Sequence, residues 1–186
     1  ELNHIAPLDH LNDTQKVFLG KKVFKKCENL SVFSIKKSWV IIIEEKCFDK
    51  LEKLKLIRLI SDSIRFKPNF ISNCHSLSHI EIQTESDIII NSDIFKGCPL
   101  DTVLIHSSDL KLCSCCFNGF RALKNIDICC ESFKFEENCF KNSPLLTIFS
   151  LIIKQDFTIN NEHFIDCDTI QNLTLGSKSK LLISES

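Results

Sequence analysis

Several residue types are scarce or missing in this chain of 186 residues, and each absence excludes a class of protein. Tyrosine and methionine are absent, and there are only four glycines and four prolines. That scarcity excludes collagen-like and linker-rich chains. Without methionine, we expect a processed N-terminus or a segment cut from a longer chain. The net charge of −1 at pH 7 gives no general attraction to nucleic acid, so we expect no nucleic-acid partner.

Long apolar runs are missing as well. Runs such as 40–43 and 88–90 are far shorter than the roughly 20 residues that cross a bilayer. No basic start followed by an apolar core resembles a signal peptide. We therefore expect no membrane insertion within this segment. The remaining composition, 44% hydrophobic and 25% charged, is ordinary for a folded protein.

A phenylalanine recurs along the chain at a nearly constant interval. In its clearest form it is followed three residues later by a cysteine, as at Phe95 and Cys98. We number each repeat unit from this anchor as position 0; the anchors are Phe24, Phe48, Ile71, Phe95, Phe117, Phe140 and Phe164. They are separated by steps of 22 to 24 residues. Repetition at this interval is typical of solenoid proteins, in which units stack on one another.

Other apolar positions keep the same phase as the anchors. Positions −7 and −5 are apolar in every unit, as at Ile88 and Ile90. Positions +9 and +11 are apolar too, as at Ile80 and Ile82, except that the unit at Phe95 has lost one residue after Cys98 and supplies Val103 and Ile105 in these roles. Such pairs predict strands with one buried face, and the 0, +3, +6 spacing predicts a short helical or 3₁₀ turn. One unit cannot bury its own apolar edge, so neighbours must stack. We therefore predict a mainly β repeat solenoid with parallel strand ladders and units of about 23 residues.

The repeat also divides the chain. We expect residues 1–15 to be a partial or degenerate repeat at the edge of the coil. Residues 16–186 are expected to form about seven units, as a segment of a longer array.

The full unit reads I-x-I-x-x-x-ϕ-F-x-x-C-x-x-L-x-x-I-x-I. Its first half is carried by Ile88, Ile90, Ile94, Phe95 and Cys98, and its second by residues 70–82, FISNCHSLSHIEI. This pattern resembles the BspA-like leucine-rich repeat over residues 16–186. The resemblance implies a non-catalytic, surface or secreted protein that binds other proteins, and hence an adhesion or recognition module without cofactors. An intracellular leucine-rich repeat scaffold is the alternative.

One strand of each unit has an outward side formed by positions +8, +10 and +12. Leucine-rich repeats align this side into a continuous sheet, and exposed aliphatic residues on it favour protein binding. Scattered apolar surface residues are the ordinary alternative. The candidate partner-binding residues are Val32, Leu56, Arg58, Ile60, His79, Glu81, Leu104, His106, Asp127, Ile148 and Ile152.

Trp39 occupies a column that is otherwise polar, with Asp62, Ser86 and Glu131 among its members. A lone tryptophan there is either an interface anchor or a cover for a turn. Three glycosylation sequons begin at Asn12, Asn29 and Asn172, and they matter only for a secreted chain. Chance occurrence in an Asn-rich sequence is the alternative.

The chain has eleven cysteines. Seven lie in columns −1 and +3, where we expect small buried apolar side chains. For Cys113, Cys115, Cys129 and Cys130, a zinc site, a disulfide and unpaired thiols all remain open. His106 and Cys129 are expected to be neighbours on adjacent units, a pairing that suits a nucleophile with its base, or a weak metal site. No pocket-forming insertion accompanies them, so we predict no enzyme.

Overall fold

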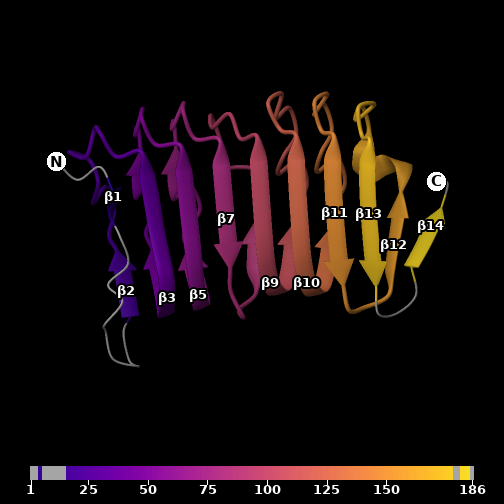
Figure 1. The fold of residues 1–186 in the computed structure, drawn as a ribbon, viewed down its shortest axis with the longest axis horizontal. Helices are drawn as coiled ribbons and strands as arrows, with labels where there is room; N and C mark the ends of the chain where they lie inside the picture. Colours follow the sequence, from indigo (N-terminus) through magenta and orange to yellow (C-terminus); the bar gives the residue numbers. More distant parts are fainter. Residues whose placement is uncertain (1–3, 6–15, 178–180, 185–186) are drawn as a thin grey trace.

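The computed structural model describes residues 4–5, 16–177 and 181–184. The chain winds as a coil whose rungs lie side by side along one axis, with β1 at one end and β14 at the other (Figure 1). Strands of consecutive rungs pair in parallel, and the register from β5 (Leu56–Phe66) to β7 (His79–Gln83) advances by 23 residues, from Leu56 to His79. The predicted parallel β-solenoid is confirmed.

Fourteen strands and one short 3₁₀ helix make up the described chain. They are β1 (His4–Ile5), β2 (Lys16–Leu19), β3 (Val32–Ile43), β4 (Phe48–Asp49), β5 (Leu56–Phe66), β6 (Ile71–Ser72), β7 (His79–Gln83), β8 (Ile88–Ile90), β9 (Thr102–Leu112), β10 (Asn125–Phe135), β11 (Ile148–Ile153), β12 (Phe157–Asn160), η1 (Asn161–Phe164), β13 (Asn172–Ser177) and β14 (Leu181–Ser184). The main sheet runs β1-β3-β5-β7-β9-β10-β11-β13, with β2 on β3 and β8 on β9.

The two strands that the sequence predicts for each unit are joined by a bend. In β9 one continuous strand carries Val103 and Ile105 before the bend, and Leu110 and Leu112 after it, all of them buried. In some other rungs the same path is divided between two strands, as with β11, which points down in Figure 1, and β12, which points up. Each rung therefore has a first and a second strand segment with a corner between them, and the core fills the space between the segments.

The anchor phenylalanines stack along the coil. The ring centroids of Phe95 and Phe117 are 5.8 Å apart, and those of Phe117 and Phe140 are 5.5 Å apart. The rings of Phe24 and Phe48, at 5.1 Å, and of Phe140 and Phe164, at 6.0 Å, stack in the same way. Such offset stacks add to the free energy gained from burying the rings. The predicted register is thus confirmed, with Ile71 interrupting the stack.

The turns that follow the anchors are held by hydrogen bonds from residue i+3 to residue i. The amide of Cys27 donates to the Phe24 carbonyl at 2.8 Å, and the amide of Leu30 donates to the Cys27 carbonyl at 3.0 Å. These bonds are of the 3₁₀ kind that the spacing predicts. In the described chain only η1 is long enough to form a 3₁₀ helix, and the other units have separate single turns.

Each tight turn needs a residue in the left-handed region, and in this glycine-poor chain most of these residues are not glycine. The residues at position +2 lie in this region, with φ between 53° and 77°; they are Lys50, Asn73, Gly97, Gly119, Asn142 and Asp166. Glycine, asparagine and aspartate tolerate this region better than other residues, so they recur here. The column is visible in the sequence, but hydrophobic periodicity does not reveal it.

The predicted edge segment 1–15 lies largely outside the described residues. Its described part, β1, pairs in parallel with β3 and so adds a further strand to the ladder.

Candidate binding face and groove

The residues predicted to bind a partner lie on the outward side of the first strand segments. We call this surface the sheet face; it consists of Val32, Leu56, Arg58, Ile60, His79, Glu81, Leu104, His106, Asp127, Ile148 and Ile152. Strand register places them in three ladders, in which Leu56 pairs with His79, Glu81 with Leu104, and Cys129 with His106. Every member of the sheet face is at least partly exposed. The structure therefore brings the predicted residues together.

Polar and apolar side chains are mixed on the sheet face. Arg58 forms an ion pair with Glu81 on the next rung. The Nε2 atom of His79 lies 3.9 Å from Oδ1 of Asp101. Ile148 and Ile152 are the most exposed aliphatic members, with 42% and 47% of their surface accessible. This end of the face therefore offers aliphatic surface to a partner.

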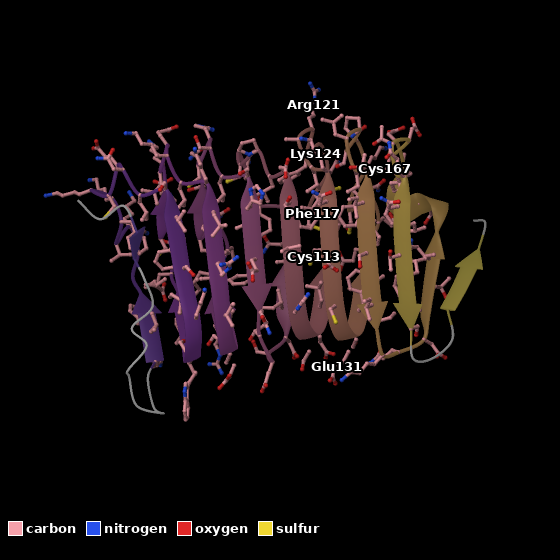
Figure 2. All side chains as sticks on the ribbon, viewed as in Figure 1. Cys113, Phe117, Arg121, Lys124, Glu131 and Cys167 are labelled. Atoms are coloured by element: carbon pink, nitrogen blue, oxygen red, sulfur yellow. The ribbon has the colours of Figure 1, made fainter. Side chains whose placement is uncertain are left out.

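A groove of about 740 Å³ crosses the rungs at the corner between the strand segments. One wall is position +12 of the sheet face, and the other holds exposed side chains that follow the corner. We call it the corner groove; its walls include Ile60, Gln83, His106, Cys129 and Ile152 on one side and Trp39, Asp62, Glu85, Glu131 and Lys154 on the other. In Figure 2, Glu131 lies at the lower edge of the coil, and Arg121 and Lys124 lie at the opposite edge, where the turns are.

Small hydroxyl side chains form the floor of the corner groove. Oγ of Ser61 lies 3.3 Å from Oγ of Ser38 and donates to the Ser63 carbonyl at 3.1 Å. On a later rung, Oγ of Ser107 donates to the Asp109 carbonyl at 3.4 Å. Such hydroxyls supply hydrogen bonds where a strand bends.

Sequence reasoning missed this column. The signal was a serine or threonine at regular intervals between the two apolar pairs, namely Ser38, Ser61, Thr84 and Ser107. All four residues are buried.

Trp39 stands at one end of the corner groove, with 42% of its surface exposed. The pairs Ser38–Ser61 and Val40–Ser63 place it one rung from Asp62. The amide of Glu85, on the rung after that, donates to the Asp62 carbonyl at 3.1 Å. The sequence columns put Ser86 beside Asp62, but the break between β7 and β8 brings Glu85 there instead.

His106 and Cys129 are cross-rung neighbours, as predicted, and both line the corner groove. His106 is exposed and Cys129 is half-buried. Within the described residues, no three His, Cys, Asp or Glu side chains are grouped so that they could hold a metal ion. The pair thus lacks the ligand set of a zinc site.

All eleven cysteines are free of disulfide bonds. In the part of the chain that the structure describes, Cys113, Cys115, Cys129 and Cys130 are not part of a metal-binding cluster. Of the seven column cysteines, six are buried as predicted and Cys27 is half-buried. Burial raises the pKa of the Cys47 thiol to about 12, and that of Cys130 likewise to about 12. These two buried thiols therefore remain protonated at neutral pH.

Two of the cysteines at position +3, Cys74 and Cys167, also act as hydrogen-bond donors. Sγ of Cys74 donates to the Phe48 carbonyl at 3.4 Å, and Sγ of Cys167 donates to the Phe140 carbonyl at 3.1 Å. In each case the acceptor is the anchor residue of the preceding rung. The thiols thus satisfy main-chain carbonyls as well as filling space.

The predicted glycosylation sites differ in position. Asn12 lies outside the described residues. Asn29 is exposed in a turn, where its Oδ1 accepts a hydrogen bond from Nζ of Lys53 at 2.7 Å. Asn172 is exposed at the start of β13, in the same ladder as Ile148. A glycan on Asn172 would therefore cover the end of the sheet face.

Comparison with known proteins gives one match. A family model described as the BspA type leucine rich repeat region fits residues 17–91 and 88–185 in six copies. The matched region consists of repeats, and no catalytic domain is identified in it. No curated protein and no solved structure matches the chain. Among the described residues, no helix has the length and apolar character needed to cross a membrane.

Proposed function

The chain belongs to the BspA-type leucine-rich repeat family, and we propose on this premise that it is a non-enzymatic module that binds a protein partner through the sheet face. The observation that carries the proposal is the continuous ladder of partly exposed residues that includes Leu104, Ile148 and Ile152. Solenoids offer long, shallow surfaces of this kind, which suit proteins rather than small molecules. The ladder is already built by strand pairing, so binding needs little ordering of the backbone.

The second strand segments offer a different surface. Their outward residues include Phe18 and Ile89, which are 61% and 56% exposed. They also include Arg65, which is exposed, and Lys111, which forms an ion pair with Glu136. The first segments pair in one unbroken sheet from β3 to β13, whereas the described second segments are not paired between β5 and β8. The sheet face is therefore the better candidate, because it presents one continuous ladder of aliphatic and polar side chains.

Site-specific photo-crosslinking tests this proposal. A photoreactive phenylalanine analogue replaces Leu104 on the sheet face or, as the matched control, Arg65 on the second segment, in cells that naturally make the protein. We expect a discrete conjugate from position 104 that disappears when Ile148 and Ile152 are both changed to Ser. Conjugates of equal yield from both positions, or from position 65 alone, would refute the sheet face as the binding surface.

We further propose that the module works at the cell surface or outside the cell, as members of its family typically do. Asn29 is then the glycan site compatible with binding, since a glycan on Asn172 would obstruct the sheet face. A glycopeptide map of the native protein should show a modified Asn29. A bare Asn29 together with eleven reduced cysteines would count against this location.

An intracellular scaffold is the second candidate, and a specific observation favours it. The thiols of Cys74 and Cys167 donate structural hydrogen bonds, which only the reduced form can do. A reducing compartment preserves them without further protection. Labelling of intact, unpermeabilised cells separates the candidates, because a scaffold is labelled only after permeabilisation.

A further inference from the structure

One end of the corner groove combines an exposed indole with two carboxylates. Trp39, Asp62 and Glu85 lie on three successive rungs and line the same groove. Rungs of a parallel sheet are roughly 4.8 Å apart, so the three side chains lie within the span of one long cationic side chain.

The negative charges at this end of the groove are not balanced by an ion pair within the described chain. Some carboxylates elsewhere on the coil pair with a cation on a neighbouring rung, as in Lys21–Glu45, Lys111–Glu136 and Lys154–Glu131. Among the described residues, neither Asp62 nor Glu85 has an ion-pair partner. Like charges on adjacent strands destabilise a sheet, and a bound cation would remove that repulsion.

We propose that this end of the corner groove binds an arginine side chain of an extended segment of the protein partner. The guanidinium stacks on the face of Trp39 and donates hydrogen bonds to the carboxylates of Asp62 and Glu85. Arginine suits the site better than lysine because its planar group both stacks on an indole and donates to two acceptors at once. This inference rests on the proposed protein-binding function and names the chemistry of the partner.

The groove beyond this end fits the rest of such a segment. Ile60 adjoins Asp62 and offers apolar surface, and Ile152 lies four rungs further along. Four rungs span roughly 19 Å, which an extended segment of about six residues covers. The partner segment therefore carries an arginine at one end and an aliphatic side chain about six residues away.

The chain contains its own reporter for this site. Trp39 is the only tryptophan and tyrosine is absent, so intrinsic fluorescence comes almost entirely from the proposed site. The probe is the peptide acetyl-Arg-Ala-Ala-Ala-Ala-Ala-Leu-amide, compared with versions in which citrulline or lysine replaces arginine. We expect the arginine peptide to change Trp39 fluorescence saturably, lysine to bind at least fivefold more weakly, and citrulline to give no change.

Variants test which side chains are responsible. Asp62→Asn with Glu85→Gln should weaken binding of the arginine peptide at least tenfold, and high salt should weaken it in the unaltered chain. Glu137→Gln is the matched control, because Glu137 is exposed but does not line the groove. Circular dichroism confirms that each variant is folded. Equal binding of the arginine and citrulline peptides, or no effect of the double variant, would overturn the proposal.

The two proposals can fail separately. If the double variant still forms the partner conjugate from position 104 but no arginine peptide binds, the arginine site is wrong and the sheet face stands. If the peptide binds as expected but position 104 gives no conjugate, the sheet face is wrong and the arginine site stands.

Discussion

Ser143 occupies a place that a thiol holds in other rungs. Its Oγ donates to the Phe117 carbonyl at 3.0 Å, just as Cys74 and Cys167 donate to the anchor carbonyls of their preceding rungs. In the repeat pattern this serine departs from the cysteine column. In the structure it has the same chemical role, because a hydroxyl and a thiol can each donate one hydrogen bond.

Removing the Ser143 hydroxyl should therefore lower the stability of the fold, although only one atom of the side chain is lost. Ser143→Ala is expected to lower the free energy of unfolding by about 1–3 kcal/mol, because the buried carbonyl of Phe117 loses its hydroxyl donor. Ser143→Cys restores a donor and is expected to cost less than half as much. Urea denaturation followed by circular dichroism measures both values. Equal losses in the two variants would show that the hydrogen bond contributes little.

At the scale of the element, the notable feature is a strand that turns a corner without ending. β3, β5, β9 and β10 each continue from the first segment into the second. Between β3 and β5 the register shifts between Ile35 and Ser38, which is the mark of a β-bulge. The hydroxyl column lies at this corner, where the side chains must be small and must supply hydrogen bonds to the bent backbone.

Ser61 tests whether the corner depends on its hydroxyls. Ser61→Ala removes the contacts to Ser38 and to the Ser63 carbonyl, and should cost about 1–2 kcal/mol of unfolding free energy. Ser61→Thr keeps the hydroxyl, and Thr84 shows that the column accepts a threonine, so this variant should lie within about 0.5 kcal/mol of the parent. Thermal and urea denaturation compare them. If Ser61→Thr lowers the free energy of unfolding as much as Ser61→Ala, the size of the side chain rather than its hydrogen bonding stabilises the corner.

At the scale of the whole molecule, the buried thiols make stability depend on pH. In the unfolded chain Cys47 and Cys130 titrate near their ordinary value of 9.0, whereas in the fold burial raises each pKa to about 12. Between these values the unfolded chain binds fewer protons than the native one, so stability falls as pH rises. Their contribution is fully present below pH 9.

We therefore expect the free energy of unfolding to decrease above pH 9, by about 1.4 kcal/mol per pH unit for each such thiol. The double variant with Cys47→Ala and Cys130→Ala should be less stable at pH 7 but should lose stability less steeply between pH 9 and 10.5. Urea denaturation at fixed pH values gives the two slopes. Parallel slopes would mean that these thiols do not control the alkaline limit.

The sequence predicted the coil well because a solenoid is nearly one-dimensional. Each buried column, such as that of Phe117 and Phe140, follows from residues one unit apart, so local spacing determines the packing. The same reasoning placed His106 beside Cys129. The sequence pattern predicted only that the cysteines at position +3 are buried apolar side chains, because hydrophobic periodicity carries no information about hydrogen-bond donors.

The amino-acid sequence by itself determined the repeat length, the register of the strands and the side chains of the sheet face, since these depend only on which residues alternate and recur. The corner groove was decided by tertiary structure, because its shape depends on where each strand bends and on how far the backbone departs from regular pairing. Glu85, rather than Ser86, stands beside Asp62 for this reason: the interruption between β7 and β8 changes which residue meets the neighbouring rung. A repeat pattern gives the number of residues in a unit, but the path of the chain around the corner determines which of them meet.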